Sequence, residues 1–390
     1  MRLQSILPAV ILNRYVCSNT CEVRGSFDGS DSVCSRVLVT GGAGFIGSNL
    51  VESLLSQNLR VRVLDSLETG FIQYLDITHP NLEVLVGSIE DMNLLRTSVD
   101  GMDGVFHLAA ASKVAPSLKD PSMATLNVRA NALGTANILE ASVQSGSVKR
   151  FVYAASSTYY GNQAVPFTES APFVPSSPYA ASKFMGELIT STYDTVFNLS
   201  TVNLRFFMVY GPRQPTTGGY AIVTGKFMNQ ASRNETLTIE GTGENFRDFI
   251  HVQDLVAGIV AAFKSEVRGT TINLGSGEKH TIKEVADMIS HNQTHVAPRP
   301  FDLQGTLANT SLAESALGFK PIHDFKTETL RMKRNPDEQY LNAFWKDPGT
   351  LQKLNIMIPG YSNMTLVDQN EAVVAQIKEK GFHSFREMLI

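Results

Sequence analysis

Three glycines at a fixed spacing, Gly41, Gly44 and Gly47, constrain the fold of this chain more than any other feature. They follow residues 36–40, an apolar, β-branched run that predicts a buried strand, and precede residues 48–57, which have a helical apolar pattern. In such a unit the first glycine makes the tight turn, the second lets the backbone approach a pyrophosphate, and the third lets the helix pack closely on the strand. The sequence therefore predicts a dinucleotide-binding unit with phosphates at the N-terminus of the helix.

An acid at the end of the next predicted strand supports this interpretation. Residues 61–65 read as a second strand, and its last residue, Asp65, lies 18 positions after Gly47. A carboxylate there accepts hydrogen bonds from the ribose hydroxyls of the cofactor and repels a 2′-phosphate. We therefore expect NAD rather than NADP.

The rest of the chain alternates predicted strands with predicted helices. Further strands are expected at residues 84–86, 105–108, 150–154 and 199–205, and long helices at 123–145 and 178–195. This alternation indicates an α/β fold with a doubly wound parallel sheet of the Rossmann type. A smaller α/β substrate lobe is expected to follow, where the chain becomes rich in loops.

These patterns divide the chain into four parts. Residues 1–35 read as an N-terminal extension, either a targeting segment or a disordered one, and residues 36–206 as the NAD-binding domain. Residues 207–330 read as the interleaved substrate lobe. The segments 248–252 and 271–274 are expected to return to the sheet, and residues 331–390 form a tail without an assigned role.

Composition excludes several classes of protein. A formal net charge of -4 argues against nucleic acid as the main partner. No uncharged apolar run approaches the roughly 18 residues that a membrane span needs. All three cysteines lie before residue 36 without a neighbouring histidine cluster, so no metal site is expected. We predict a cytoplasmic protein, with an organelle or the secretory pathway as the alternative through the N-terminal extension.

A second motif, Tyr179 and Lys183, suggests chemistry next to the cofactor. Residues four apart share one face of a helix, so the ammonium can lie beside the phenol. A free tyrosine titrates near ~10, and lowering its pKa by about three units needs roughly 4 kcal/mol of stabilisation of the phenolate. A neighbouring Lys⁺ and a positive nicotinamide ring in a partly dry site could supply it.

Several further motifs occur in the same order as in a known family. The chain resembles the extended short-chain dehydrogenases/reductases of the NAD-dependent epimerase/dehydratase family, and most of all the UDP-sugar 4-epimerases. The resemblance covers about residues 36–320 and rests on these stretches: Thr40 to Gly47, His107 to Ala110, Asn131 to Thr135, Ser156 to Gly161, Tyr179 to Lys183, Leu204 to Arg213 and Arg247 to Val252.

The resemblance implies roles for individual residues. Tyr179 is the expected acid/base, Lys183 lowers its pKa and grips the nicotinamide ribose, and Ser156 hydrogen-bonds the sugar O4, with Thr158 as a second candidate. The implied cofactor contacts, besides the glycines, are Phe45, Ile46, Asp65, Leu108, Ala109, Lys113, Asn131, Tyr179, Lys183 and Phe207. The implied substrate contacts are Ser156, Tyr179, Arg247, Arg299 and Thr306.

Some of these roles have plainer alternatives. Lys113 could be a solvated surface lysine, and Asn131 could brace a helix. Arg247 and Arg299 suit a diphosphate because the guanidinium donates two parallel hydrogen bonds, but each could form a surface salt bridge instead.

Three positions depart from the family pattern. Ser88 replaces an acid that contacts adenine, which could loosen cofactor binding. Met208 replaces an asparagine that contacts substrate, as in the glucuronate 4-epimerase branch. Thr306 aligns with a bulky gatekeeper, and a small residue there leaves space for an N-acetyl group.

The resemblance implies an NAD-dependent enzyme that inverts C4 of a UDP-sugar (UDP-glucose/galactose, UDP-GlcNAc or UDP-glucuronate) through a transient 4-keto intermediate. The 4,6-dehydratases and decarboxylases of the family carry an extra acid just after the catalytic hydroxyl, and residues 156–161 hold none. They remain the alternative, together with a non-catalytic NAD-binding scaffold. Family members usually form homodimers through the helices that correspond to residues 123–145 and 178–195.

Overall fold

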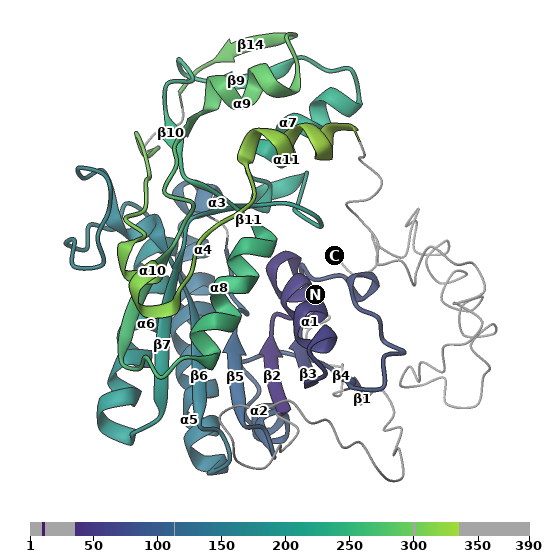
Figure 1. Cartoon of the computed structure of the whole chain (residues 1–390), viewed down its shortest axis with the longest axis vertical. Coiled ribbons are helices and arrows are strands. Elements are labelled where there is room, and N and C mark those ends of the chain that lie inside the picture. Colours follow the sequence, from purple (N-terminus) through teal and green to yellow (C-terminus); the bar gives the residue numbers. More distant parts are fainter. Residues whose placement is uncertain (1–9, 12–35, 113, 299–301, 335–390) are drawn as a thin grey trace.

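The computed structural model describes residues 10–11, 36–112, 114–298 and 302–334 of the chain. A parallel sheet with helices on both faces forms the larger lobe, and a smaller α/β lobe lies at one end of it (Figure 1). The sheet order is β1-β4-β3-β2-β5-β6-β7-β12, in which the short β1 pairs antiparallel with β4 and the other pairs are parallel. The predicted doubly wound fold is therefore confirmed.

The strands of this sheet are short, and the central ones are buried along nearly their whole length, as expected for strands covered on both faces. Their bounds are β1 Val10–Ile11, β2 Arg36–Thr40, β3 Arg60–Asp65, β4 Leu82–Val86, β5 Gly104–His107, β6 Arg150–Ser156, β7 Ser200–Phe206 and β12 Thr270–Leu274. Each strand predicted before residue 206 is present within one or two residues of its expected bounds.

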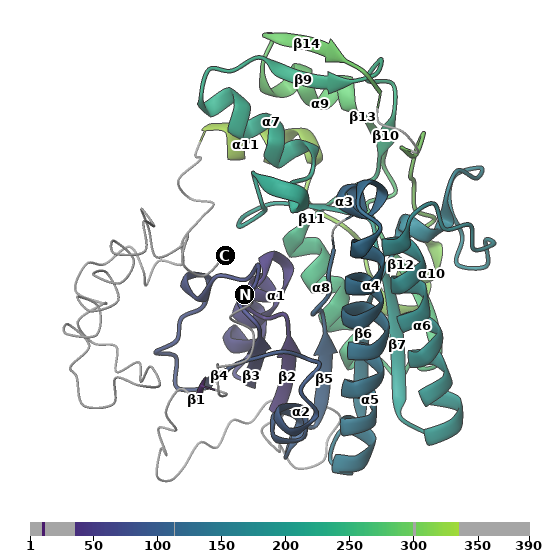
Figure 2. The same cartoon turned by 180° about the vertical axis from the view of Figure 1, so that it is seen from behind.

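Alternate residues of β2 face two separate cores. Val37 and Val39 pack with α1 (Phe45–Ser56), α8 (Val252–Lys264) and α10 (Ser311–Leu317). Leu38 packs on the other face with α2 (Met92–Val99), α5 (Gly134–Ser145) and α6 (Pro178–Phe197). Figures 1 and 2 show the two helical layers from opposite sides.

The helix expected at 123–145 is interrupted by a different hydrogen-bonding pattern. It consists of α4 (Ser122–Val128), a π-helical turn at Arg129–Leu133 and α5, preceded by the short α3 (Val114–Lys119). π-Helical turns are often found at functional sites, and here the turn contains Asn131. A sequence pattern with a helical period does not reveal this change.

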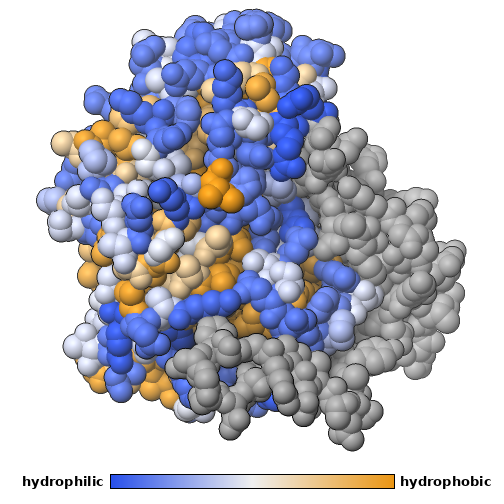
Figure 3. Space-filling view, in the orientation of Figure 1, coloured by the Kyte–Doolittle hydropathy of each residue, from blue (hydrophilic) through white to orange (hydrophobic). Residues whose placement is uncertain are grey.

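The smaller lobe has its own core, built around Tyr210, Phe227, Phe249 and Phe325. Its elements are β8 Met208–Tyr210, α7 Val223–Ser232, β9 Leu237–Glu240, β10 Phe246–Arg247, β11 Phe249–His251, β13 His280–Thr281, α9 Ile282–Ile289, β14 Gln293–Val296 and α11 Phe325–Arg334. Among the residues that the structure describes, 3₁₀ turns lie at Ile72–Tyr74, Ser157–Tyr160 and Gly218–Tyr220. The surface of this lobe is mostly hydrophilic on the face shown in Figure 3, where the lobe is at the top.

Two expectations about the return to the sheet have different outcomes. The strand predicted at 271–274 is β12 and joins β7 in the main sheet. The segment 248–252 does not join it, and that expectation is wrong: β11 pairs in parallel with β8 in a separate two-stranded sheet. β12 occupies the position beside β7 in the main sheet. β11 therefore pairs with β8, which follows β7 in the chain and lies outside the main sheet.

Some predictions fall outside the described residues: those on Lys113, on Arg299, on the extension 1–35 apart from residues 10–11, and on the tail beyond residue 334. Within the described ranges, no helix is long and apolar enough to cross a bilayer, and no cluster of three or more acidic, histidine or cysteine side chains could hold a metal ion.

Candidate active site

The glycine turn between β2 and α1 lies against the loop that follows β5. Gly41 has a φ of +72°, and a Cβ on it would lie 2.7 Å from the backbone nitrogen of Ala109. A Cβ on Gly47 would collide with the carbonyl oxygen of Gly41. A side chain at either position would therefore disturb the turn, and this close packing explains the first and third glycines of the motif.

The N-terminus of α1 is open to an anionic ligand. Gly44 is the N-cap, and in the described part of the chain no side chain caps this helix end or adds an acid to its first turn. The first turn starts with Phe45 and Ile46, which are half-buried against the core. Backbone N–H groups and the positive end of the helix dipole suit a pyrophosphate at this place.

Asp65 lies at the end of β3, next to the glycine turn, and is 7% exposed. Burial raises the pKa of its carboxyl group, and hydrogen bonds from the N–H groups of Leu67 (2.8 Å) and Ala43 (2.9 Å) oppose that rise. Each N–H donates to a different carboxylate oxygen, so both oxygens retain a lone pair for a ribose hydroxyl. The glycine turn, the open helix end and Asp65 together fit a dinucleotide.

Leu108 and Ala109, two predicted cofactor contacts, are held by β2. The N–H of Leu108 donates to the carbonyl of Thr40, and the N–H of Ala109 to its hydroxyl. The Thr40 hydroxyl in turn contacts Nδ1 of His107 at 2.7 Å, and Nε2 of His107 contacts Thr135 Oγ1 at 3.0 Å. Burial, assisted by the charge of Lys183, lowers the pKa of His107 to about 3, so this histidine is neutral.

The hydrogen-bond directions define the tautomer of His107. Thr135 Oγ1 donates to the carbonyl of Asn131 at 2.7 Å, so it accepts from Nε2–H of His107. Nδ1 then accepts from Thr40. Sequence reasoning included His107 in a motif but assigned it no role, because hydrogen bonds between side chains on β2, β5 and α5 have no local signature in the sequence.

Asn131 lies in the π-helical turn and is fully buried. Its side chain accepts from the N–H of Ala111 at 2.8 Å and donates to the carbonyl of Ala111 and to Ser182 Oγ at 3.1 and 2.9 Å. These contacts fix the loop after β5 against α6, as in the bracing alternative given above.

Tyr179 lies in the first turn of α6, which Ser177 caps through a hydrogen bond from the N–H of Ala180. It is 8% exposed, and burial raises the pKa of its phenol while a hydrogen bond with Ser156 opposes that rise. Ser156 ends β6 and contacts the hydroxyl of Thr158 at 2.9 Å. The structure thus brings the predicted acid/base and the predicted relay hydroxyls together.

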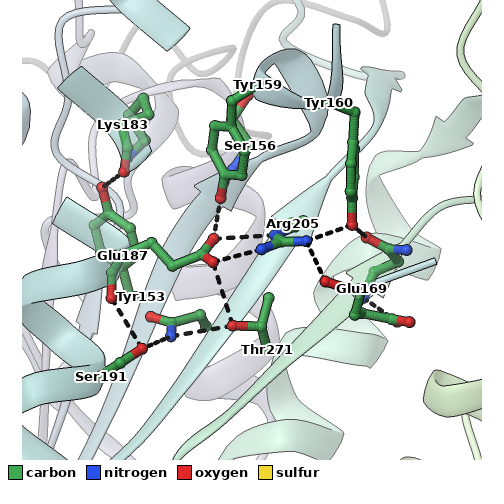
Figure 4. A network of polar contacts seen from close by, with 12 residues as sticks. Tyr153, Ser156, Tyr159, Tyr160, Glu169, Lys183, Glu187, Ser191, Arg205 and Thr271 are labelled. Atoms are coloured by element: carbon green, nitrogen blue, oxygen red, sulfur yellow. Dashed lines mark hydrogen bonds and ion pairs between the residues drawn. The ribbon is translucent and has the colours of Figure 1, made fainter. Parts of the chain in front are cut away.

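Lys183 is one helical turn further along α6 and is 3% exposed. Its Nζ lies over the ring of Tyr153, 4.3 Å from the centroid, and both side chains appear in Figure 4. Burial lowers the pKa of the ammonium to about 7, and the nearby Glu187 opposes this effect. A phenolate at Tyr179 and an ammonium at Lys183 would stabilise each other in this poorly solvated site.

Two further predicted substrate contacts, Arg247 and Thr306, belong to the smaller lobe. Arg247 is 8% exposed and forms an ion pair with Asp302 at 2.9 Å, the salt-bridge alternative given above, although Asp302 remains partly exposed. Thr306 is buried, and its hydroxyl accepts from the N–H of Asp248 at 3.5 Å. Phe207, the last predicted cofactor contact, is buried in a small apolar cluster with Tyr160 and Phe167.

The departures from the family pattern have ordinary local environments. Ser88 accepts a hydrogen bond from the N–H of Glu90 at 3.1 Å. Met208 starts β8 and packs on the core of the smaller lobe.

Known proteins resemble the chain over most of its length. The family model described as GDP-mannose 4,6 dehydratase matches residues 38–332. A putative UDP-glucose 4-epimerase from Methanocaldococcus jannaschii is 32% identical over 307 residues, which cover 76% of this chain and 96% of that protein. A UDP-N-acetyl-alpha-D-glucosaminuronate decarboxylase from Bacillus cytotoxicus is 32% identical over 276 residues, 68% of this chain and 84% of that protein.

Solved structures agree with the sequence relatives. A UDP-N-acetylglucosamine 4-epimerase from Methanobrevibacter ruminantium M1, in complex with UDP-N-acetylmuramic acid, has a TM-score of 0.72 and 31% identity, with 77% of this chain and 97% of that one covered. A UDP-glucuronic acid 4-epimerase variant from Bacillus cereus, in complex with UDP-4-deoxy-4-fluoro-glucuronic acid and NAD, has a TM-score of 0.72 and 27% identity, with coverages of 78% and 100%.

Proposed function

Because this chain belongs to the NAD-dependent epimerase/dehydratase family of extended short-chain dehydrogenases/reductases, we propose that it is a UDP-sugar 4-epimerase. One observation carries the proposal: Ser156, Tyr179 and Lys183 are buried together on β6 and α6, at the sheet edge where the glycine turn and Asp65 fit a dinucleotide. In open α/β sheets this edge, at the carboxyl ends of the strands, is where ligands bind.

The proposed chemistry begins with a proton at O4 of the sugar. Tyr179, as a phenolate, takes this proton directly or through the hydroxyl of Ser156. NAD, when bound, supplies a nicotinamide ring that can accept the hydride from C4 and, once reduced, give it back. Lys183 stabilises the phenolate with its positive charge, and the buried site strengthens this attraction.

The sugar must turn between the two hydride transfers, while the nucleotide stays anchored. We assign this anchoring to the smaller lobe, approximately residues 207–330, with Arg247 and Arg299 on the diphosphate. The guanidinium of Arg247 is buried, and its partner Asp302 is partly exposed, so the ion pair could open to let the arginine bind a phosphate. Once the 4-keto sugar has turned, hydride returns to its opposite face and Tyr179 returns the proton to O4.

The alternative functions lack comparable support from the site residues. Elimination of water across C5 and C6 needs an added acid and base, and residues 156–161 contain neither aspartate nor glutamate. A decarboxylase nevertheless stands among the relatives, so this alternative remains a question for product analysis. A non-catalytic scaffold does not need the tyrosine, lysine and serine that this chain retains.

We propose that the protein forms a homodimer. Apolar side chains that are exposed lie along α4, the π-helical turn and α6, which run side by side on the outer face in Figure 2: Val128, Leu133, Met185 and Leu188. A face of this kind suits an interface between copies. Light scattering should give twice the monomer mass for the wild type. Leu188→Asp should halve the measured mass, whereas Ile322→Asp, at an exposed apolar residue elsewhere, should leave it unchanged.

The cytoplasmic location stays a prediction from the sequence.

Proton NMR of the purified protein with UDP-glucose, UDP-N-acetylglucosamine or UDP-glucuronate tests the proposed activity. We expect the epimer with the axial 4-hydroxyl to appear for one of them, without added NAD, because a cofactor regenerated in each cycle can stay bound. A 4-keto-6-deoxy sugar or release of CO₂ would favour the alternatives. No conversion of any of the three, even with NAD added, would contradict the proposed activity.

A further inference from the structure

The face of α6 that holds Tyr179 and Lys183 continues with a third buried polar residue, Glu187. The three residues are four apart, so they lie one above another on the same side of the helix. The carboxylate of Glu187 accepts hydrogen bonds from Arg205 on β7, at 2.7 Å from Nη2 and 3.1 Å from Nε (Figure 4). Both side chains are almost fully buried, at 8% and 5% exposure for Arg205 and Glu187.

This ion pair is connected to the catalytic hydroxyl through Tyr159. Tyr159 follows Ser156 by three residues, in the 3₁₀ turn Ser157–Tyr160, and is 1% exposed. Its hydroxyl donates to Oε2 of Glu187 and accepts from the backbone N–H of Ser156 at 3.4 Å. The phenol oxygen thus joins the backbone of Ser156 to α6, which holds Tyr179.

The far side of Arg205 is fixed as well. Its Nη1 donates to the hydroxyl of Tyr160 at 2.6 Å and to the carbonyl of Glu169 at 3.0 Å. Tyr160 in turn donates to Oδ1 of Asn273 on β12 at 2.7 Å. With four hydrogen bonds from its three guanidinium nitrogens, Arg205 is held in one position, and it holds Glu187 in turn.

From this connectivity we propose that Glu187, Arg205 and Tyr159 are positioning residues, which set the place of the Ser156 hydroxyl relative to Tyr179. The inference rests on the proposed function and adds residues that do not themselves touch the substrate. A buried ion pair is weak evidence for stability, because an apolar replacement often does as well. A catalytic hydroxyl, however, must be placed accurately, since a displacement of about 1 Å can cost roughly 100-fold in rate.

Two neighbouring tyrosines offer a matched test. Tyr159→Phe and Tyr160→Phe each remove one phenol oxygen from the same turn, and both side chains are 1% exposed. Only Tyr159 contacts the backbone of Ser156; Tyr160 contacts Arg205 and Asn273. We expect Tyr159→Phe to lower kcat about 10-fold or more with little change in KM, and Tyr160→Phe to stay within about threefold of the wild type in kcat.

Thermal unfolding of both variants separates positioning from general loss of structure. Similar Tm values together with different kcat values support the proposal. Equal kcat values for the two variants, or a fall in kcat that follows Tm in both, would overturn it.

A second measurement does not depend on turnover. Crystal structures of the wild type and of Tyr159→Phe should show the Ser156 hydroxyl displaced from Tyr179 in the variant. An unmoved Ser156 would overturn the positioning role whatever the kinetics show. If the wild type converts none of the UDP-sugars, the proposed function fails, and this comparison of structures still decides the inference.

Discussion

At the scale of single residues, the account rests on the phenol of Tyr179. Replacing it with phenylalanine removes the group that takes the proton from the sugar, so we expect Tyr179→Phe to lower kcat by at least about 100-fold. Bound NAD should be retained, because the phenylalanine ring still fills the position of Tyr179 and the glycine turn, Asp65 and the loop after β5 are unchanged. Tyr193→Phe, a partly buried tyrosine further along α6, is the control and should keep its activity. Full turnover in the Tyr179 variant would contradict the assigned role.

A second residue, His107, makes stability depend on pH. Its pKa is about 3 in the folded protein, against an ordinary value of 6.5. Below pH 6.5 the unfolded chain takes up a proton that the folded protein does not, so the stabilisation present above pH 6.5 is lost as the pH falls. His251, whose pKa is lowered to about 4 by burial, acts in the same direction. Each histidine contributes a slope of up to about 1.4 kcal/mol per pH unit.

Urea unfolding between pH 7 and pH 5 measures this slope in the wild type and in His107→Gln. Glutamine cannot take up a proton, so we expect the variant to lose less free energy of unfolding over this range than the wild type does. Equal slopes in the two proteins would show that His107 is protonated in the folded state.

At the scale of elements, the contact between α1 and the glycine turn can be tested directly. A Cβ at Gly47 would meet the carbonyl oxygen of Gly41, so Gly47→Ala must move the helix away from the turn. We expect the variant to be purified with much less NAD, as measured by releasing the cofactor and recording its absorbance. Ser56→Ala, at the exposed end of the same helix, should keep the wild-type content. Unchanged NAD in Gly47→Ala would show that the third glycine is not needed.

Long elements could be predicted from the sequence, whereas short ones could not. The parallel strands of the main sheet are mostly apolar runs between helices with a clear period, and each lies near its expected bounds. The two-residue β1 was not predicted, because it lies in the segment expected to be a targeting or disordered extension. β8 and β11 have three residues each, too few to show a period, so nothing indicated that they would pair with each other. The π-helical turn at Arg129–Leu133 keeps the composition of a helix and differs only in its hydrogen bonds.

The part of the candidate site that is encoded by short sequence motifs could be predicted. The glycine turn, Asp65 and Tyr179 with Lys183 are encoded by short spacings. Glu187 and Arg205 meet from α6 and β7, eighteen residues apart, and their pairing appears only when the chain is folded. The bracing contacts of Asn131 likewise depend on α6 and on the loop after β5.

At the scale of the whole molecule, we assign different roles to the two lobes: cofactor binding and proton transfer to the larger lobe, and anchoring of the nucleotide to the smaller one. The larger lobe brings the dinucleotide-binding features and the proton-transfer residues to one edge of the sheet, and the smaller lobe continues from β8, directly after β7. This arrangement predicts that hydride leaves C4 and returns to C4 inside one closed site, without exchange with water.

The most direct test of this central claim uses the UDP-sugar that the protein converts, labelled with deuterium at C4 and incubated in ordinary water. The account predicts that the epimer with the axial 4-hydroxyl forms and keeps the deuterium at C4, as seen by proton and deuterium NMR. Loss of deuterium from C4, its appearance at C6, or an unlabelled product would contradict a reaction in which the C4 hydride is removed and returned to the same carbon.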